Sequence, residues 1–333
     1  MNIVIITIFN EMNYGAYLQA FALGEYLKSK GHTVSYYENS RWTSRDSFHA
    51  LHLRDLKHLG FNLSLLRAYK KDWMRITKTN TFDGFDLAII GSDELWNVRN
   101  VNFSHDRYLL GEGVDSRRTI TYAVSSNNCT PEEFSNVYAE VKGFGSLDAI
   151  SVRDAATDGL VRALTGVEPE VVLDPTFLID YPVSNRVVSG QYMLVYGYYF
   201  TEMEVERIKE YRLKYPDAKL VSVGFRHEWC DENVPCGPLD FLDCVRHACA
   251  VATSTFHGTV FSIIFRKSFI AFARDNSKIL DILDKFGLSD RNSSDRVVAS
   301  ISRNVNYSDS VEREISSWVR KSKDYLENQL SER

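Results

Sequence analysis

The sequence lacks long apolar runs, and this absence excludes one class of protein. No stretch of its 333 residues approaches the roughly 20 consecutive apolar residues that a membrane-spanning helix requires. The start, "MNIVIITIFNEMNYG", has no basic region and no small-residue cleavage site, so it predicts no secretory signal. Together these absences predict a cytoplasmic protein.

The sequence also has few cysteines and no excess of positive charge. Its five cysteines form no C-x-x-C pair, and the spacings in "CDENVPCGPLDFLDCVRHAC" match no common zinc site. We therefore expect reduced thiols and no metal. The formal net charge of −5 gives no electrostatic reason to bind nucleic acid, so no nucleic-acid partner is expected.

Short apolar runs alternate with helical patterns, an order typical of α/β proteins with parallel sheets. The apolar runs predict strands at 2–9, 33–37, 85–96, 118–126, 148–154, 169–178, 192–200, 218–225, 248–254 and 268–273. The helical patterns predict helices at 14–31, 201–214, 238–247, 258–266, 278–286 and 310–330. The series breaks at 180–191, so we predict two Rossmann-like domains, 1–185 and 186–305, that face a cleft. A helical insertion is expected at about 41–80 and a C-terminal helix within 306–333.

Ligands of such sheets bind at the carboxyl ends of the strands, so the residues that follow each strand are candidate site residues. Asn13 and Gly15 follow the first strand, where a small residue lets the backbone approach a ligand; taken alone, Asn13 is better explained as a helix cap. In "IIGSDELWN", Ser92, Asp93 and Glu94 follow a buried strand. Their carboxylates can bind sugar hydroxyls or accept protons from them, unless Asp93 caps a helix and Glu94 is merely solvated.

Two further charged residues follow strands in the first predicted domain. Arg153 of "SVRD" can bind a carboxylate or phosphate with two hydrogen bonds, or it can be held by Asp154 or another acid as part of the structure. Asp174 of "LDPTF" precedes a proline, which favours a turn, and it is also a candidate cleft residue.

The stretch "ATSTFHGTVFSIIF" places one histidine at the start of a predicted helix. Ser254 or Thr255 can cap this helix, and His257 lies in its first turn beside Gly258. A helix N-terminus attracts anions, and a histidine ordinarily titrates near pH 6.5. The placement favours a residue that binds an anion and transfers a proton over a histidine buried in the core.

The segments "NYGAYLQAFAL", "IIGSDELWN", "ISVRD", "VVLDPTF" and "STFHGTVFSIIF" occur in the order and approximate spacing of the polysaccharide pyruvyl transferase family. The sequence resembles this family from about residue 3 to residue 290, and is similar to its bacterial branch among capsule and exopolysaccharide genes. The resemblance implies a fold like that of two-domain (GT-B-like) glycosyltransferases. It also implies the reaction: phosphoenolpyruvate, a co-substrate, gives its pyruvyl group to two hydroxyls of a sugar. The products are a cyclic ketal and phosphate, and no cofactor is required.

The resemblance also implies roles for individual residues. His257 would act on the donor and its protons, Arg153 would hold a negative group of the donor, and Asp93 would serve as base toward the acceptor sugar. Donor contacts are expected from the remainder of the histidine motif, which comprises Ser254, Thr255 and Gly258.

The sequence departs from the family at one position. Well-studied members have an arginine two residues before the histidine, where this chain has Thr255. Arg226 and Arg274 each follow a strand of the second domain and are candidates to replace it. The alternatives are a nucleotide-sugar-dependent glycosyltransferase of the same architecture and a non-catalytic relative. A lipid-linked acceptor would bring the protein to the inner face of the cell membrane, through the basic stretch 41–78.

Overall fold

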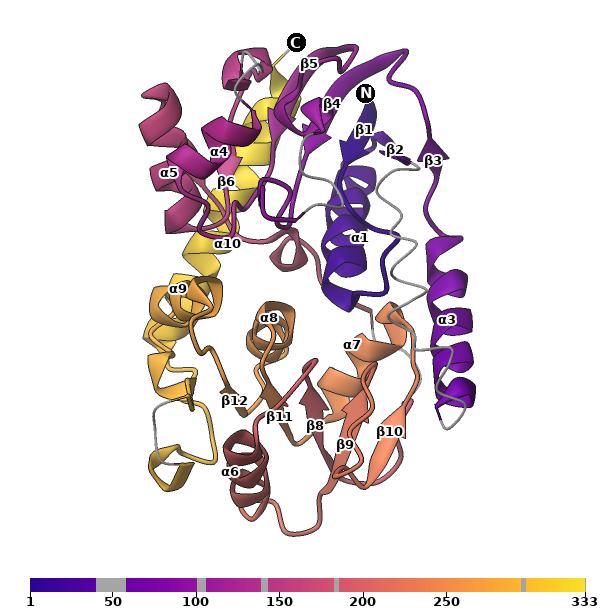
Figure 1. Ribbon diagram of the computed structural model, residues 1–333, viewed down its shortest axis with the longest axis vertical. Coiled ribbons are helices and arrows are strands. Elements are labelled where there is room, and N and C mark those ends of the chain that lie inside the picture. Colours follow the sequence, from indigo (N-terminus) through magenta and orange to yellow (C-terminus); the bar gives the residue numbers. More distant parts are fainter. Residues whose placement is uncertain (40–57, 101–105, 139–142, 183–185, 295–297, 333) are drawn as a thin grey trace. The chain divides into compact units, whose positions relative to one another are not determined.

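The structure is a computed structural model that describes residues 1–39, 58–100, 106–138, 143–182, 186–294 and 298–332. The chain divides into two compact units. Unit 1 comprises Met1–Leu51, Trp73–Asp180 and Ser317–Arg333, and unit 2 comprises His52–Asp72 and Tyr181–Ser316. Each unit contains a five-stranded sheet whose strands are connected through helices (Figure 1).

The sheet of unit 1 has the strand order β3-β2-β1-β4-β5, and every pair in it is parallel. Its strands are β1 (Asn2–Ile6), β2 (Thr33–Tyr37), β3 (Lys78–Thr79), β4 (Phe85–Ile90) and β5 (Ser116–Thr121). A short parallel pair, β6 (Ser151–Val152) and β7 (Glu170–Val171), continues beyond β5 through isolated bridges. The helical elements are α1 (Tyr14–Ser29), η1 (Arg107–Leu110), α4 (Pro131–Val137), η2 (Gly143–Ser146), α5 (Ala155–Thr165) and η3 (Pro175–Phe177). β1 and β4 are the most apolar strands, and they form the buried centre of this sheet.

The sheet of unit 2 repeats this arrangement with the order β10-β9-β8-β11-β12, again parallel throughout. Its strands are β8 (Tyr192–Tyr196), β9 (Lys219–Val223), β10 (Glu232–Val234), β11 (Ala250–Thr253) and β12 (Phe269–Ala271). The helical elements are α6 (Glu202–Arg212), α7 (Pro238–His247), α8 (Phe256–Ile264), α9 (Ser277–Lys285), η4 (Ser289–Arg291) and η5 (Val298–Ser300). The prediction of two Rossmann-like α/β halves is therefore confirmed.

Helix α3 (Leu59–Trp73) lies in the predicted insertion, and most of it belongs to unit 2. The physical reason is a contact with α7, whose N-cap residue, Gly237, has no side chain to cap it. The Asp72 carboxylate of α3 accepts a hydrogen bond from the Leu239 amide, at 3.1 Å, and so caps α7 from outside. A methyl group on Gly237 would come within 2.8 Å of the same carboxylate. We had predicted the insertion as part of the N-terminal domain; its residues 41–57 lie outside the described residues.

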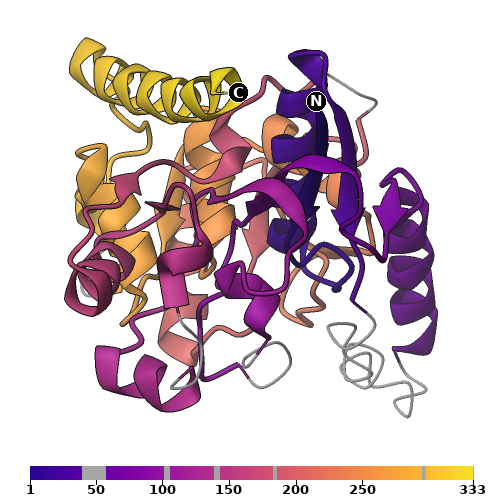
Figure 2. The same ribbon diagram turned by 90° about the horizontal axis from the view of Figure 1, so that it is seen from above.

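Helix α10 (Asp309–Ser331) ends the described chain, where we predicted a C-terminal helix. Its second half belongs to unit 1. Its last turns, yellow in Figure 2, form hydrogen bonds with β5. Arg118 of β5 donates to the Gln329 carbonyl at 2.7 Å, and the Tyr325 hydroxyl donates to the Thr121 carbonyl at 3.0 Å. None of the helices in the described ranges has both the length and the apolar character that crossing a membrane requires.

Candidate functional site

Each sheet has a topological switch point, where the next strand is added on the opposite side of the first strand. Proteins with such α/β sheets bind ligands at these switch points. In unit 1 the point lies between β1 and β4, which pair in register from Ile3 with Leu87 to Ile6 with Ile90. In unit 2 it lies between β8 and β11. The predicted site residues follow strands at or near these two points.

Gly91 and Ser92 form the turn that leaves β4. Gly91 has a φ of +131°, and a Cβ atom there would lie 2.1 Å from the Tyr122 carbonyl oxygen, so only glycine fits. Ser92 is fully buried; its hydroxyl donates to the Ala123 carbonyl at 2.9 Å, and its amide donates to the side chain of Gln19 at 3.2 Å. Ser92 therefore holds the turn in place, although we predicted it as a cleft residue.

Asp93 follows this turn in a left-handed conformation, with a φ of +80°. It pairs with Val124 in an isolated parallel bridge and does not begin a helix, so the helix-cap interpretation is wrong. Ala123, beside Val124, also has a positive φ, of +53°. Non-glycine residues adopt this region rarely and at a cost, and such residues concentrate at functional sites. The neighbouring Glu94 is partly buried and accepts a hydrogen bond from Asn97 at 3.0 Å.

Arg153 lies beside Asp93 and is only 4% exposed. Its guanidinium donates to Asp174 at 2.8 Å and comes within 3.7 Å of the Asp93 carboxylate. Burial lowers the pKa of Arg153, but the charges of Asp174, Asp93 and Asp154 outweigh it, so that the pKa is raised. Asp174 also accepts from the amide and the hydroxyl of Thr176 at the start of η3. Both the turn and the structural ion pair that we considered for these residues are therefore present.

Glu11 is the residue of this region that the sequence did not single out. It lies in the segment that leaves β1, the strand that pairs with β4, and it is partly buried; Asp93 lies in the segment that leaves β4. Burial, followed by the negative charge of Asp93, raises the pKa of Glu11 to about 7. Nearby Asn13 caps α1 by accepting from the Gly15 amide at 2.9 Å, as the capping interpretation predicted. The signal that could have identified Glu11 is its place after the first strand, in "NEMNYG".

In unit 2 the loops after β8 and β11 meet closely. A Cβ atom on Gly197, which follows β8, would lie 2.3 Å from the Ser254 hydroxyl, so glycine is required for this approach. Ser254, which follows β11, is partly exposed and its amide donates to the Tyr196 carbonyl at 3.3 Å. Thr255, rather than Ser254, caps α8: its hydroxyl accepts from the Gly258 amide at 2.9 Å.

His257 lies in the first turn of α8, as predicted, but it is buried, with only 8% of its surface exposed. Its ring contacts Phe256 edge to face, with the ring centroids 5.1 Å apart. Gly258 is needed beside it, because a Cβ atom there would lie 2.1 Å from the Thr253 hydroxyl. This close packing against the end of β11 fixes where the first turn begins, and with it the position of the histidine.

The two candidate arginines of unit 2 differ in their surroundings. Arg274 forms a two-pronged ion pair with Glu204, at 2.8 and 2.5 Å, so its guanidinium is already engaged. Arg226 is exposed and forms no ion pair or hydrogen bond with the described part of the chain. The adjacent His227 ties the Arg226 loop to the switch point through a hydrogen bond of 2.9 Å with the Gly197 carbonyl. Arg226 is therefore the better placed of the two to receive an anion.

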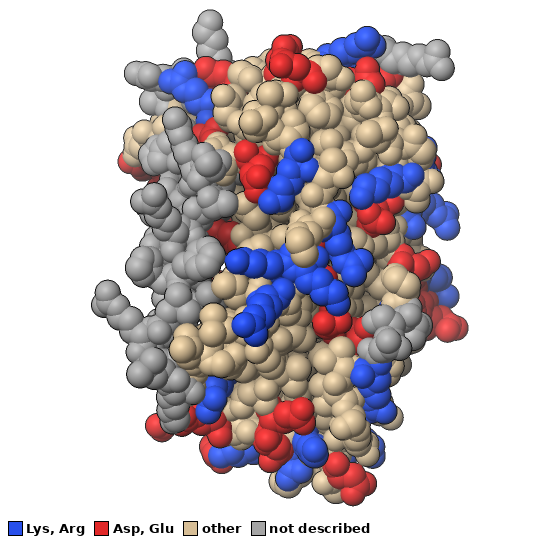
Figure 3. Space-filling model, turned by 90° about the vertical axis from the view of Figure 1, so that its right-hand side faces the viewer, with Lys and Arg blue, Asp and Glu red and all other residues tan. Residues whose placement is uncertain are grey.

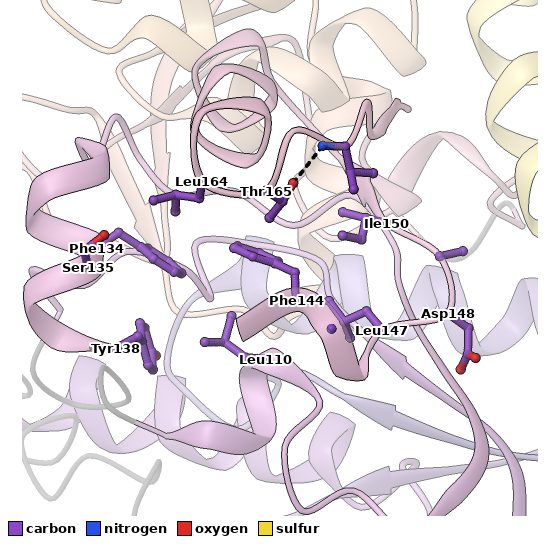
Figure 4. Close-up of a pocket in the computed structure, with 13 residues that line it drawn as sticks. Leu110, Phe134, Ser135, Tyr138, Phe144, Leu147, Asp148, Ile150, Leu164 and Thr165 are labelled. Carbon is purple, nitrogen blue, oxygen red and sulfur yellow. Dashed lines mark hydrogen bonds between the residues drawn. The ribbon is translucent and has the colours of Figure 1, made fainter. Parts of the chain in front are cut away.

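A cavity with a volume of about 780 Å³ lies elsewhere in unit 1 (Figure 4). Phe134 and Phe144 stack in its wall, with ring centroids 5.8 Å apart. Its other walls come from segments that lead into β5, β6 and β7, around Leu110, Leu147 and Leu164. Neither Asp93 nor Arg153 lines this cavity.

The cysteines and other metal-ligating residues form no centre in the described ranges. No group of three histidine, cysteine, aspartate or glutamate side chains there is arranged to hold a metal ion. All five cysteines are free thiols, and burial together with the charge of Asp231 raises the pKa of Cys230 to about 12. A thiol with such a pKa stays protonated near neutral pH and is therefore a poor nucleophile.

Several solved structures share this fold at low sequence identity. The S. aureus MnaA–UDP co-structure has a TM-score of 0.51 and 11% identity, and the alignment covers 98% of this chain and 94% of that chain. The UDP-GlcNAc 2-epimerase from Methanocaldococcus jannaschii has a TM-score of 0.48 and 11% identity, covering 99% of each chain. The glycosyltransferase SnogD from Streptomyces nogalater has a TM-score of 0.42 and 11% identity, covering 97% and 95%. The first of these likenesses supports the predicted GT-B-like fold, and at such identity it shows the fold alone.

No curated protein matches the chain by sequence. A family model described as polysaccharide pyruvyl transferase matches residues 13–276, which include each site residue predicted from the sequence, from Asn13 to Arg274.

Proposed function

Because this chain belongs to the polysaccharide pyruvyl transferase family, we propose that it transfers the pyruvyl group of phosphoenolpyruvate to a sugar. The acceptor is a sugar in a capsule or exopolysaccharide precursor, and two of its hydroxyls become the oxygens of a cyclic ketal. The family match carries this proposal, because it spans titratable residues placed at the switch points of both sheets.

The reaction balances without a cofactor. The methylene carbon of phosphoenolpyruvate gains a proton, which leaves positive character on the carbon that bears the phosphate. One sugar hydroxyl loses its proton and adds to that carbon. The C–O bond to phosphate then breaks, and the second hydroxyl loses its proton and closes the ring. Of the two hydroxyl protons, one replaces the proton given to the methylene carbon and the other leaves with the phosphate or to solvent.

Donor chemistry is assigned to unit 2. We propose that His257 protonates the methylene carbon, since it lies in the first turn of α8, where the helix start favours an anionic substrate. Thr255 cannot replace the family arginine electrostatically, because it is neutral and its hydroxyl caps α8. Arg226, exposed and unengaged by described residues, is proposed to bind a negative group of the donor instead.

Acceptor chemistry is assigned to unit 1. We propose that Asp93 accepts a proton from the attacking hydroxyl and that Glu11 is the second acid–base group beside it. The resemblance implied that Arg153 holds a negative group of the donor. Its burial and its ion pair with Asp174 favour a different role, in which Arg153 positions the Asp93 carboxylate.

The rival function is that of a nucleotide-sugar-dependent glycosyltransferase. The chain shares its fold with a protein solved in complex with UDP, which is the reason to test this rival. Titration calorimetry with phosphoenolpyruvate and with UDP-sugars separates the two. The direct test is phosphate release from phosphoenolpyruvate in the presence of candidate lipid-linked oligosaccharides, with the ketal product detected by mass spectrometry. Binding of UDP-sugars without binding of phosphoenolpyruvate would replace the proposal by its rival, and binding of neither would indicate a non-catalytic relative.

A further inference from the structure

The outward face of α3 carries several cations and no anion. Arg67, Lys70 and Lys71 are exposed and form no ion pair or hydrogen bond within the described part of the chain. Residues three and four apart are neighbours on a helix, so these three side chains share one face. Figure 3, which views the α3 side of the molecule, shows a group of basic side chains at its centre.

The acid of α3 does not offset these charges at the surface. Asp72 is 4% exposed and is directed toward α7, where it accepts the hydrogen bond from Leu239. Leu65 and Tyr69, at 6% and 2% exposure, bury the same side of the helix. The inward face of α3 therefore anchors the helix to unit 2, and the three cations of the outward face form no ion pair with any residue of the described ranges.

Exposed apolar side chains flank this basic group. Leu63, one turn before Arg67, is 37% exposed, and Met74, directly after the helix, is 80% exposed. Cations beside protruding apolar side chains are typical of helices that lie on anionic lipid, where the cations contact head groups and the apolar side chains enter the interface. The net charge of the whole chain is −5, so general electrostatics oppose this attraction and it must come from the local face.

We propose that the outward face of α3, formed by Leu63, Arg67, Lys70 and Lys71 with Met74 beside it, binds the surface of an anionic lipid membrane. This inference does not depend on the donor or on the proposed reaction. It assigns the membrane contact that we expected from the stretch 41–78 to one described helix, α3.

The test is co-sedimentation of the full chain with vesicles of phosphatidylcholine, with and without phosphatidylglycerol. We expect binding only to the vesicles that contain phosphatidylglycerol, and a fall in binding as salt shortens the Debye length from about 10 Å at 0.1 M toward about 3 Å at 1 M. The triple variant Arg67→Gln, Lys70→Gln and Lys71→Gln should bind to the phosphatidylglycerol vesicles at least about tenfold less tightly. Each basic residue near an anionic surface contributes to the free energy of membrane binding. Glutamine preserves helix propensity, and circular dichroism verifies the fold.

The matched control removes the same charge from α10, through Arg313→Gln, Arg320→Gln and Lys323→Gln, and should leave vesicle binding unchanged. A Met74→Gln variant should weaken binding to vesicles but not to heparin, because only a membrane accepts an apolar side chain. Equal loss in both triple variants would overturn the proposal. So would the absence of vesicle binding, or heparin binding with no effect of Met74→Gln on vesicles, which would identify a soluble polyanion as the partner.

Discussion

Glu11 and Asp93 are two carboxyl groups in one region whose surroundings differ. Arg153 faces Asp93 at 3.7 Å, whereas the pKa of Glu11 is raised by burial and by the charge of Asp93. A carboxyl group whose pKa is raised by burial and by a neighbouring charge is suited to an acid role near neutral pH. Glu11 can thus hold a proton near neutral pH.

The raised pKa of Glu11 predicts a pH-dependent stability. Between the ordinary glutamate pKa of 4.5 and about 7 the folded protein binds a proton that the unfolded chain has lost, so stability falls as pH rises across this window. Glu11→Gln removes this penalty. We expect the variant to exceed the wild type by about 2–3 kcal/mol in free energy of unfolding at pH 8, and the difference to shrink as pH falls toward 4.5. Urea denaturation at a series of pH values measures it.

Glu314→Gln on α10 is the control for this prediction, because Glu314 is exposed and forms no ion pair with described residues. Its stability should follow that of the wild type at each pH. A constant offset between Glu11→Gln and the wild type at all pH values would show that Glu11 has an ordinary pKa.

His257 carries the proton transfer to the donor in the proposed reaction. His257→Ala should lower ketal formation by about 10²–10⁴-fold, the usual contribution of a general acid. Phosphate release and product formation are the measurements, and near-ultraviolet circular dichroism tests the fold. His32→Ala, which removes a histidine beside the N-terminus, is the control. Turnover of His257→Ala at the wild-type rate would remove this residue from the mechanism.

The contrast between these residues shows what the sequence predicts. The hydrogen bonds of Asn13, Thr255 and Asp174 join residues two or three apart, so local patterns were sufficient to suggest them. The pKa of Glu11 is raised by burial and then by the charge of Asp93, and both depend on the fold: the pairing of β1 with β4 is what brings Asp93 near. The partner of Arg153, likewise, was identified by the fold and not by the adjacent Asp154.

Arg153, which follows β6, and Asp174, which caps η3, form an ion pair that is almost fully buried. The side chains of Arg153 and Asp174 are 3% and 0% exposed, and their closest atoms lie 2.8 Å apart. Removing one partner of such a pair leaves the other charge buried, which typically costs about 3–5 kcal/mol. The contact ties the end of a strand to the turn that begins η3.

Asp174→Asn tests this contact, since asparagine can still accept from the Thr176 amide while losing the charge. We expect the free energy of unfolding to fall by about 3–5 kcal/mol, as measured by urea denaturation. The double variant Arg153→Met with Asp174→Asn should recover part of this loss, because it leaves no buried charge. A cost below about 1 kcal/mol for the single variant would mean that Arg153 is solvated or neutralised by another acid.

The predicted elements were most accurate where a helix has both a clear start and a clear end. The helix predicted over 238–247 coincides with α7, whereas the strands predicted at 148–154 and 169–178 shrink to β6 and β7, two residues each. The chain turns at Asp174–Pro175 into η3, and this turn ends the second of these strands early. Helix α4 was not predicted, although the capping box formed by Thr130 and Glu133 marks its start.

The chain as a whole passes between its two units four times, so neither unit is one continuous segment. Unit 1 is completed by Ser317–Arg333, which supplies Ser322, Tyr325 and Leu326 to its core. The Ser322 hydroxyl accepts from the Leu173 amide at 2.8 Å, directly before Asp174. The last turns of α10 therefore support the segment that holds Arg153, and no pattern in a solvent-facing helix predicted this.

Leu326→Ala tests the dependence of unit 1 on its C-terminal segment. Leu326 is fully buried, so its truncation should cost about 2–5 kcal/mol. Hydrogen exchange shows which sheet loses stability. Amides of β4 and β5 should lose protection, while those of β8 and β11 should lose less, because they belong to unit 2. Leu213→Ala, at a residue that is 69% exposed, should change stability by no more than about 0.5 kcal/mol. Equal loss of protection in both sheets would mean that the two units unfold as one cooperative body, and that α10 stabilises the molecule as a whole.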